Sequence, residues 1–297
     1  MLTHTLSQPT APQRVVVLGA NGFVSGELVR RLQEQGVPVL PLGRNELDLL
    51  SPDAAANLAP HLRPDDALVF VSALAPCKNP AMLAQNLAMA NAVAAALKER
   101  PVAHVVYVSS DAVYMDIAEP MTEATPAAPG SLHGVMHLAR ELILQSELGG
   151  KVPLALLRPT LIYGARDPHN GYGPNRFARL AAKGEEIVFF GNGEERRDHV
   201  SIADVGALLV GILFRRSTGI LNAVSGEVVS FREAAEWIVK ESGSKSVLRA
   251  TPRSGPMPHN GYRAFDPAAR RAAFPEIPVT PWREGLRTLT ISILRPL

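Results

Sequence analysis

Short apolar runs alternate with helical patterns over the first 160 residues. The run RVVVLG (14–19) is continuously apolar, as expected for a strand that is buried on both faces of a sheet. Further strand candidates cover residues 37–43, 67–72, 104–110 and 152–159. Helical patterns cover residues 26–36, 52–60, 80–99 and 131–148. This alternation predicts β-α-β units with right-handed crossovers, and therefore a parallel sheet.

The pattern is looser after about residue 160. Residues 164–175 form a loop rich in Gly, Pro and Asn, and residues 201–214 predict a strong helix with Ser201 as its N-cap. The segment 243–265 is polar and irregular, which predicts a long loop. The second half of the chain is therefore expected to form a smaller lobe beside the main sheet.

Composition excludes several classes of protein. The chain has 297 residues, 46% of them apolar and 20% charged, so it can bury a sizeable core. A net charge of +2 without a stripe of Lys and Arg argues against nucleic acid. Cys77 is the only cysteine, so an internal disulfide is impossible. No apolar run approaches the ~18 residues of a membrane helix, and residues 1–13 do not resemble a signal peptide, so we expect a soluble cytoplasmic protein.

Three glycines follow the first predicted strand and enter the first helix. They are Gly19, Gly22 and Gly26. Glycines allow a tight turn, and they let backbone N–H groups approach a pyrophosphate at a helix N-terminus. Their position between a strand and a helix favours a dinucleotide site over a purely structural turn.

The stretch GANGFVSGELVRRL resembles the opening of the extended short-chain dehydrogenase/reductase family, which includes nucleotide-sugar epimerases, dehydratases and reductases. That family spaces its glycines as G-x-x-G-x-x-G. Gly19 and Gly22 match the first two, Ser25 occupies the third slot, and Gly26 follows. The third glycine mainly serves helix–strand packing, so a small serine should cost little. The resemblance extends over about residues 14–275.

The resemblance implies an α/β fold with a Rossmann-type doubly wound parallel sheet and a smaller C-terminal substrate-binding lobe. Residues 1–13 are predicted to be a disordered tail. The NAD(P)-binding domain is expected to span residues 14–165, with 196–225 returning to it. The substrate lobe is expected to contain residues 166–195 and 226–297.

The second predicted strand ends in PLGRNELDL, without the acidic residue that NAD-preferring members place there. Arg44 could instead hold a 2′-phosphate, which favours NADP over NAD, although a solvated arginine is an equal alternative. Asp48 resembles the acidic residue near the adenine, and VSALAP (71–76) resembles the loop along the phosphates. The cofactor contacts implied by the resemblance are Gly19, Asn21, Gly22, Phe23, Val24, Arg44, Asp48, Leu49, Ala73, Asn86, Ser109, His137 and Pro159.

The segment VVYVSSDAVY (105–114) resembles the family's strand that ends in Ser-Ser-x-x-Val-Tyr. The match implies that Ser110 is the catalytic hydroxyl, which would hydrogen-bond a substrate carbonyl or alcohol. Asp111 follows it, as in dehydratase and dehydrorhamnose-reductase relatives. Dehydratases add a glutamate next, but this chain has Ala112, which disfavours dehydration.

The helix at 131–148 departs from the family pattern Tyr-Gly-x-x-Lys-x-x-x-Glu. Gly134 and Glu141 match it, but His133 and His137 replace the tyrosine and the lysine. The family mechanism uses a tyrosinate, and the pKa of that tyrosine, ordinarily ~10, is lowered by the lysine and the cofactor. This chain has no lysine between Lys98 and Lys151.

Three interpretations of the histidine pair stay open, besides a plain packed or surface pair. In the first, His133 exchanges a proton with the substrate while Ser110 orients it and His137 contacts the ribose. In the second, the chemistry is lost and the chain binds NAD(P) as a sensor, scaffold or subunit. In the third, the pair holds a metal at i,i+4 spacing with Asp111 as a third ligand. No residue is predicted as an established metal ligand.

Two later segments resemble the family's substrate side. Residues 157–167 resemble Arg-Pro-x-x-x-Tyr-Gly, and residues 189–205 resemble the segment whose arginine contacts a substrate diphosphate. Arg197 takes that slot, with a surface basic pair as the alternative. The predicted substrate contacts are Tyr114, Asn175, Arg197 and Arg253. His199 replaces an aromatic residue of the family pattern.

These observations predict an NAD(P)-dependent oxidoreductase or epimerase. It would act on a hydroxyl or keto centre of a small-molecule substrate, a nucleotide-linked sugar or a polyol. The resemblance also implies a homodimer, because in relatives the helix with the Tyr and Lys packs against its mate in a four-helix bundle. The sequence leaves the sugar, the nucleotide and the stereochemistry open.

Overall fold

The main body of the protein is built on a six-stranded sheet. The structure is a computed structural model that describes residues 1–295. The strands run in the order β2-β1-β3-β4-β5-β9, and every neighbouring pair is parallel. Their bounds are β1 (Val15–Leu18), β2 (Val39–Leu42), β3 (Ala67–Phe70), β4 (His104–Val108), β5 (Leu154–Pro159) and β9 (Gly219–Ala223). The predicted doubly wound α/β fold is confirmed, although β9 was not among the predicted strands.

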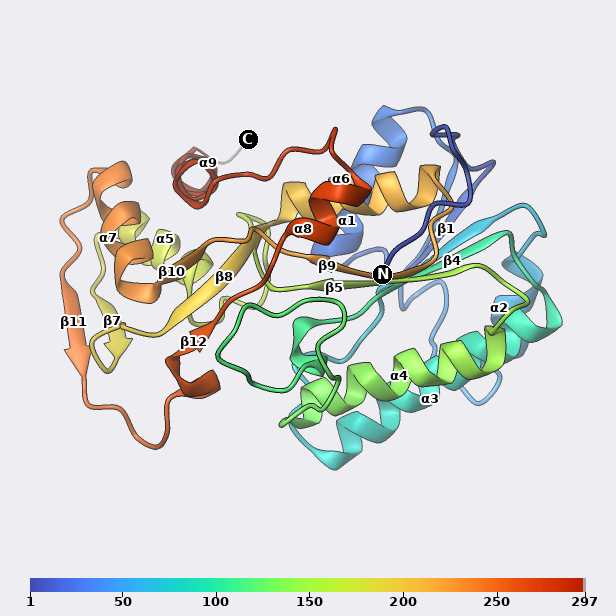
Figure 1. The fold of residues 1–297 in the computed structure, drawn as a ribbon, viewed down its shortest axis with the longest axis horizontal. Coiled ribbons are helices and arrows are strands. Elements are labelled where there is room, and N and C mark those ends of the chain that lie inside the picture. Colours follow the sequence, from blue (N-terminus) through green and yellow to red (C-terminus); the bar gives the residue numbers. More distant parts are fainter. Residues whose placement is uncertain (296–297) are drawn as a thin grey trace.

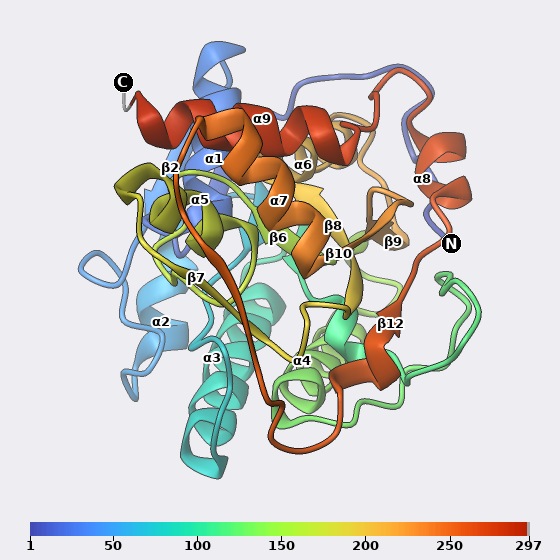
Figure 2. The same cartoon turned by 90° about the vertical axis from the view of Figure 1, so that its left-hand side faces the viewer.

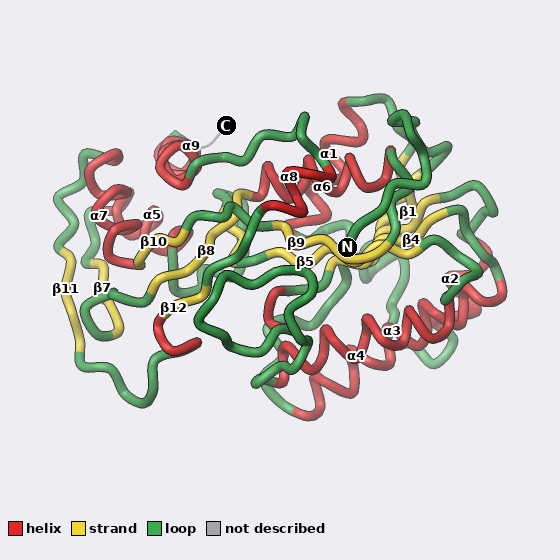
Figure 3. Tube along the Cα trace, viewed as in Figure 1, coloured by secondary structure: helices red, strands yellow, loops and turns green. Residues whose placement is uncertain are grey.

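Helices cover both faces of this sheet (Figures 1 and 3). One face carries α1 (Phe23–Glu34) and α6 (Ile202–Phe214). The other carries α2 (Ala54–Leu58), the 3₁₀ turn η1 (Ala59–His61), α3 (Pro80–Glu99) and α4 (Leu132–Leu148). Side chains of β1 alternate between the two layers, with Val15 and Val17 in one core and Val16 and Leu18 in the other. Burial on both faces is the reason that the strand sequence is continuously apolar.

The direction of winding changes at β1. The chain passes from β1 to β2 on one side and then to β3 on the other side. In doubly wound sheets, ligands bind outside the carboxyl ends of the strands at such a switch point. The segments that follow β1 and β3, which contain Gly19 and the loop 71–76, are therefore placed at the expected ligand crevice.

A smaller lobe lies beyond one end of the sheet, on the left in Figure 1, and it faces the viewer in Figure 2. Its main sheet has the order β10-β8-β12, with β6 also paired to β8, and a separate pair joins β11 to β7. An aromatic cluster that includes Phe177, Phe189 and Phe231 forms its core. The elements are β6 (Leu161–Tyr163), α5 (Pro174–Lys183), β7 (Ile187–Phe190), β8 (Arg196–Ser201), β10 (Val228–Ser230), α7 (Phe231–Ser242), β11 (Leu248–Thr251), the 3₁₀ turn η3 (Pro258–Gly261), β12 (Tyr262–Arg263), α8 (Ala268–Ala273) and α9 (Trp282–Leu294).

Strand pairing places some segments differently from the sequence-based division. β8 and β6 pair with each other, so residues 196–201 and 161–163 belong to the sheet of the smaller lobe rather than to the main sheet. The predicted loop 243–265 contains β11 and β12, because each finds a partner strand far away in the sequence. The chain returns to the main body at α6, whose N-cap is Ser201 as predicted, with its hydroxyl accepting from the Asp204 N–H.

The N-terminal segment 1–13 is not a disordered tail, and that prediction was wrong. Thr3 bridges Thr218 just before β9, and the Thr10 N–H donates to the Phe214 carbonyl. The His4 ring lies 2.8 Å from both the Ser217 hydroxyl and the Ala273 carbonyl. These long-range partners supply the order that a polar sequence cannot predict.

One described helix, α3, has the length and apolar composition of a membrane-crossing helix, with a mean hydropathy of 1.2. No apolar run of this length was expected from the sequence. In the structure, α3 packs against α4, and Met89, Val93 and Leu97 are in the core below the sheet. Core helices of globular proteins meet the same criterion, so this single helix is weak evidence for a membrane.

Candidate active site

A cavity of about 960 Å³ opens at the carboxyl ends of the central strands and extends to the smaller lobe. Its size is that of a pocket for a cofactor-sized ligand. It brings together most of the residues singled out in the sequence. These are Gly19, Asn21, Gly22, Phe23, Val24, Arg44, Asp48, Leu49, Ala73, Ser109, Ser110, Asp111, Tyr114, His133, His137, Pro159, Asn175 and Arg197. Asn86 and Arg253 do not line it.

The glycine loop after β1 is shaped by one close approach. Gly19 has φ +87°, and a Cβ there would lie 2.9 Å from the backbone nitrogen of Ser72. Only glycine therefore allows the loops after β1 and β3 to pack so closely. Gly22 is the N-cap of α1, whose first turn has no acidic residue. The Gly19 and Gly22 N–H groups donate within the protein, to the Leu42 and Gly19 carbonyls, so the first-turn N–H groups of α1 are the ones left for a ligand. This glycine cradle at a helix N-terminus fits a dinucleotide pyrophosphate.

Ser25, in the slot of the third glycine, closes this loop. Its buried hydroxyl donates to the Gly19 carbonyl at 2.5 Å and accepts from the Gly22 N–H at 3.0 Å. The serine thus stabilises the turn through hydrogen bonds, while the sequence had suggested only that it is small enough to pack.

Arg44 and Asp48 lie at the rim of the cavity beyond β2. The Arg44 side chain is 74% exposed, and its guanidinium is 3.7 Å from the Asp48 carboxylate. Such an exposed ion pair contributes little to the stability of the fold, so either side chain can change its partner. Arg44 is therefore available to a phosphate group at this rim.

Asn86 is a correction to the predicted cofactor contacts. It is fully buried on α3, where its side chain accepts from the Leu74 N–H at 2.9 Å and donates to the Leu74 carbonyl at 3.0 Å. Both ends of the amide are used inside the protein, so none is left for a ligand. Its role is to fix the loop 71–76, part of which lines the cavity.

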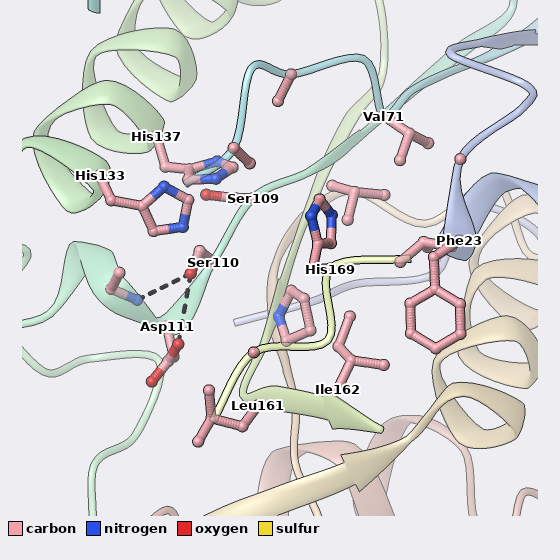
Figure 4. Close-up of a pocket in the computed structure, with 18 of the residues that line it drawn as sticks. Phe23, Val71, Ser109, Ser110, Asp111, His133, His137, Leu161, Ile162 and His169 are labelled. Atoms are coloured by element: carbon pink, nitrogen blue, oxygen red, sulfur yellow. Dashed lines mark hydrogen bonds between the residues drawn. The ribbon is translucent and has the colours of Figure 1, made fainter. Parts of the chain in front are cut away.

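Ser110 begins the 3₁₀ turn η2 (Asp111–Val113) at the end of β4. Its hydroxyl accepts from the Ala112 N–H at 3.1 Å and lies 3.4 Å from the Asp111 carboxylate (Figure 4). Asp111 in turn accepts from Arg263 of β12 at 2.8 Å, and Arg263 is only 2% exposed. An arginine of the smaller lobe thus forms an ion pair with Asp111, while the Ser110 hydroxyl lines the cavity beside it.

Helix α4 reaches this turn because of one glycine. A Cβ on Gly134 would lie 2.0 Å from the Ala112 carbonyl oxygen, so no other residue allows the same approach. Further along, Glu141 fixes the helix to the sheet. It accepts from the Ser109 hydroxyl of the β4 end at 2.5 Å and from Arg158 of β5 at 2.9 Å.

His133 lies beside Ser110, in the first turn of α4 (Figure 4). Burial lowers the pKa of its imidazole, and the Asp111 charge opposes that shift. Its Nδ1 receives only a long contact, at 3.4 Å, from the Cys77 N–H. The ring is therefore neutral near pH 7 and is weakly held by the protein, as a group that exchanges protons with a ligand requires.

His137 has a different environment. It is 6% exposed, and its Nδ1 lies 2.7 Å from the hydroxyl of Tyr107 on β4. Burial, followed by the His133 and Arg140 charges, holds its pKa well below the ordinary value. Tyr107 was missed in the sequence, although it precedes Ser109 by two positions and so faces the same side of the strand.

The metal interpretation lacks ligands. Within residues 1–295, no group of three or more His, Cys, Asp or Glu side chains is arranged to hold a metal ion. The proposed third ligand, Asp111, is paired with Arg263. The two histidine rings form a T-shaped pair with centroids 4.8 Å apart.

The substrate side of the cavity contains Arg197. Burial lowers the pKa of its guanidinium, which donates to Glu195 at 2.8 Å. Arg253, predicted as a second clamp, lies outside the cavity, where it donates to the Phe190 carbonyl at 3.1 Å and is 3.8 Å from the same Glu195. It therefore acts behind Arg197 and not at the ligand surface.

Two other predicted substrate contacts line the cavity but use their polar groups internally. The Tyr114 hydroxyl donates to the Asn222 side chain at 2.7 Å. The Asn175 side chain donates to Asp167 and accepts from the Gly164 N–H. Their first role is to hold the walls of the cavity.

Several lining residues were not singled out as site residues. His169, His259 and Tyr172 come from the loops of the smaller lobe, and His199 lies on β8. Five of the eight histidines therefore line this one cavity. Burial lowers the pKa of His199 to about 4, so its ring is neutral. Of these four residues, only His199 could be noticed in the sequence, because it departs from the family pattern. His169, Tyr172 and His259 reach the cavity through tertiary contacts, which the sequence does not show.

The sequence model of the NAD-dependent epimerase/dehydratase family matches residues 15–223. This match covers the sheet, the glycine loop, the Ser110 turn and α4. The chain belongs to this family. Membership supports enzyme activity for the cavity described above.

Two curated relatives and one solved structure illustrate the range of similarity. The chain is 25% identical to a dTDP-6-deoxy-L-talose 4-dehydrogenase (NAD(P)(+)) of Kitasatospora kifunensis, over 94% of this chain and 95% of the relative. It is 29% identical to a dTDP-4-dehydrorhamnose reductase of Burkholderia thailandensis, over 87% and 88%. The UDP-glucose 4-epimerase of Thermus thermophilus, solved with NAD, has the same fold, with a TM-score of 0.83 and 23% identity over 95% of this chain and 99% of that one.

Proposed function

We propose that this protein is an NAD(P)-dependent oxidoreductase or epimerase that acts on a hydroxyl or keto carbon of a nucleotide-linked sugar or polyol. One observation carries the proposal. Ser110 and the weakly held ring of His133 lie side by side in the cavity that also contains the glycine cradle. The named activities of the similar dehydrogenase and reductase support the same substrate class.

Several residues of the chain would hold the cofactor. The cradle formed by Gly19, Gly22 and the start of α1 suits the pyrophosphate, and the loop 71–76 lines the next part of the cavity. Arg44 at the rim favours NADP, because its exposed guanidinium suits a 2′-phosphate. When bound, the nicotinamide supplies hydride transfer to or from the reacting carbon.

The chain's own residues move the proton. In the oxidation direction, neutral His133 accepts the proton of the substrate hydroxyl on a ring nitrogen, while the Ser110 hydroxyl holds the substrate oxygen. In the reduction direction, protonated His133 returns that proton to the oxygen. His133 thus replaces a tyrosinate with a group whose pKa already lies near or below neutral pH.

Arg197 supplies a positive charge on the substrate side of the cavity. Arg197 lines the same cavity as His133, and the fixed fork of a guanidinium matches phosphate oxygens. Glu195 holds Arg197 in place from behind. We propose that Arg197 binds the diphosphate of the nucleotide, which leaves the sugar near Ser110.

The first experiment is a calorimetric titration with NAD⁺, NADH, NADP⁺ and NADPH, after any co-purified cofactor has been removed. Micromolar binding, tighter for the NADP forms, is the expected result. A screen of dTDP- and UDP-linked sugars with the preferred cofactor should then give turnover. Cofactor binding without turnover of any sugar would favour the alternative, a sensor, scaffold or subunit, and would contradict the proposed chemistry.

The role of His133 is tested by His133→Phe. Turnover should fall by about 10²–10⁴-fold, because a general acid–base group contributes that much, while the Kd of the cofactor stays close to that of the wild type. His61→Phe, which changes an exposed histidine outside the cavity, is the matched control. Unchanged turnover in His133→Phe would show that the assignment is wrong.

We also propose that the protein is a homodimer through α3 and α4. These helices pack on each other on one side of the sheet, and Val135 and Leu142 of α4 expose 37% and 56% of their surface. Light scattering on the wild type and on Leu142→Glu should give a dimer and a weakened dimer, respectively. A monomeric wild type at micromolar concentration would contradict this arrangement.

A further inference from the structure

Tyr107 lies behind the histidine pair and, within residues 1–295, makes the only hydrogen bond to the His137 ring. It is fully buried on β4, its hydroxyl is 2.7 Å from Nδ1 of His137, and the two ring centroids are 6.0 Å apart. In the same described part of the chain, the hydrogen bond to Tyr107 uses Nδ1, and the other ring nitrogen, Nε2, makes none. Because His137 lines the cavity, Nε2 is the nitrogen that remains for a ligand.

Arg140 lies one helical turn after His137 and is fully buried. Within residues 1–295 it forms no ion pair with a carboxylate. Its guanidinium is instead 4.2 Å from the centre of the Phe70 ring and 5.1 Å from that of Tyr107. It donates to the Ser72 carbonyl at 2.6 Å and to the Met136 sulfur at 3.8 Å. A buried cation without a carboxylate is costly, so its placement beside Tyr107 calls for an explanation.

The protons of this cluster can be assigned from the donor and acceptor inventory. Burial raises the pKa of Tyr107, so its phenol keeps the proton, and burial lowers the pKa of His137, so its ring is neutral. A guanidinium only donates, and its positive charge attracts the phenolic oxygen lone pairs. The hydroxyl hydrogen is thereby directed away from Arg140 and towards Nδ1 of His137.

A neutral imidazole has one donor and one acceptor. If Nδ1 accepts from Tyr107, the ring proton must be on Nε2. We propose that Tyr107, oriented by Arg140, is a positioning residue that holds His137 as its Nε2-protonated tautomer, so that the ring offers an N–H donor to a hydroxyl oxygen of the bound nucleotide. The acceptor rests on the proposed function, whereas the tautomer is a property of the protein alone.

This arrangement explains how a neutral ring can occupy a slot that a cation fills in the resembling enzymes. The donor is His137, and the positive charge lies one turn further along α4, behind the tyrosine. The edge-to-face contact with His133, at 87° between the ring planes, also limits rotation of His137 about its side-chain bonds. Both effects prepare the donor before a ligand arrives.

The test is nitrogen NMR on ligand-free protein with ¹⁵N-labelled histidine at pH 8, where the ring is neutral. The His137 signals are assigned by their loss in His137→Gln. The wild type should show a protonated Nε2 and an unprotonated Nδ1. A protonated Nδ1 in the wild type would overturn the proposal, whatever the enzyme turns over.

Tyr107→Phe removes the donor hydroxyl and keeps the ring. His137 should then lose its single tautomer, and the Kd of the cofactor should rise about fivefold, the effect of one misplaced hydrogen bond. Tyr163→Phe is the matched control, because it removes another buried hydroxyl outside the cavity. An unchanged His137 tautomer in folded Tyr107→Phe would also overturn the proposal.

The two proposals fail in different ways. If no sugar is turned over but His137 has the expected tautomer, the proposed reaction fails and the positioning role stands. If sugars are turned over and His137 is protonated on Nδ1, the positioning role fails and the reaction stands. Arg140→Met adds a second variant, which should weaken the tautomer preference without removing the Tyr107 hydroxyl.

Discussion

The glycine loop and the start of α4 both depart from the family pattern, but they accommodate the change in different ways. In the loop, Ser25 replaces a glycine and bonds to Gly19 and Gly22 within six residues of itself. In α4, His137 replaces a lysine and relies on Tyr107, which lies 30 positions away on another element. The serine finds its hydrogen-bond partners within its own turn, whereas the histidine finds its partner on another element through tertiary packing.

This difference shows when a substitution can be judged from sequence. A short hydroxyl can satisfy itself within its own turn, so Ser25 needs nothing from outside. An imidazole buried between a helix and a sheet needs a partner that the local sequence does not supply. Restoring the family residue should therefore lower the free energy of unfolding only slightly in the loop, at Ser25, and strongly in α4, at His137.

The largest expected effect comes from His137→Lys. The new ammonium would be buried near Arg140, and a buried charge without a partner costs roughly 3–5 kcal/mol. Its pKa would be lower in the folded than in the unfolded state, so the unfolded state binds more protons and the loss grows as the pH falls. Urea unfolding at pH 6 and pH 8 measures this, with the exposed His61→Lys as control. Equal stability of variant and wild type would show that α4 accepts the family residue.

A smaller effect is expected where α4 meets the Ser110 turn. Gly134→Ala places a Cβ against the Ala112 carbonyl, so the free energy of unfolding should fall by about 1–3 kcal/mol through overpacking. Gly26→Ala, also in a helix, meets nothing within 4 Å and should gain about 0.5–1 kcal/mol from helix propensity. Thermal unfolding compares the two. If both variants changed the free energy of unfolding in the same direction, the close approach of α4 to the Ala112 carbonyl would not affect stability.

The pH dependence of oxidation tests His133 itself. Because burial lowers the pKa of His133 below its ordinary value, the ring is neutral and competent as a base above about pH 6.5. The rate should be level there and should fall about tenfold per pH unit below the lowered pKa, since the neutral fraction disappears. Asp111 and His137 are the titratable groups next to it. A falling limb that persists in the residual activity of His133→Phe would assign it to another group.

The smallest effect is expected in the glycine loop. Ser25→Gly restores the family residue but removes two hydrogen bonds, so the protein should lose about 1–2 kcal/mol. Ser25→Ala separates the loss of the hydroxyl from the added flexibility of glycine. Urea unfolding and cofactor titration measure both variants. A gain in stability on Ser25→Gly would show that the serine hydroxyl contributes nothing to the turn.

Much of the fold could be predicted from the sequence. Strands buried on both faces give continuous apolar runs, and helices give apolar residues at helical spacing, so both can be recognised along the chain. The predicted strands at 14–19, 67–72 and 104–110 correspond to β1, β3 and β4. The sequence failed where order depends on distant partners. Residues 1–13 are held by β9 and its surroundings, and β12 exists because it pairs with β8.

The sequence by itself determined the glycine cradle, the position of Ser110 and the replacement of two family residues by histidines. It could do so because these features depend on residue type and spacing along one β-α unit. The tertiary structure decided what surrounds the histidines. Neutral His137 is bonded to Tyr107 beside Arg140, and Asp111 forms an ion pair with Arg263 from the smaller lobe. Burial and charge come from elements far apart in the chain, and they decide which proton each ring carries.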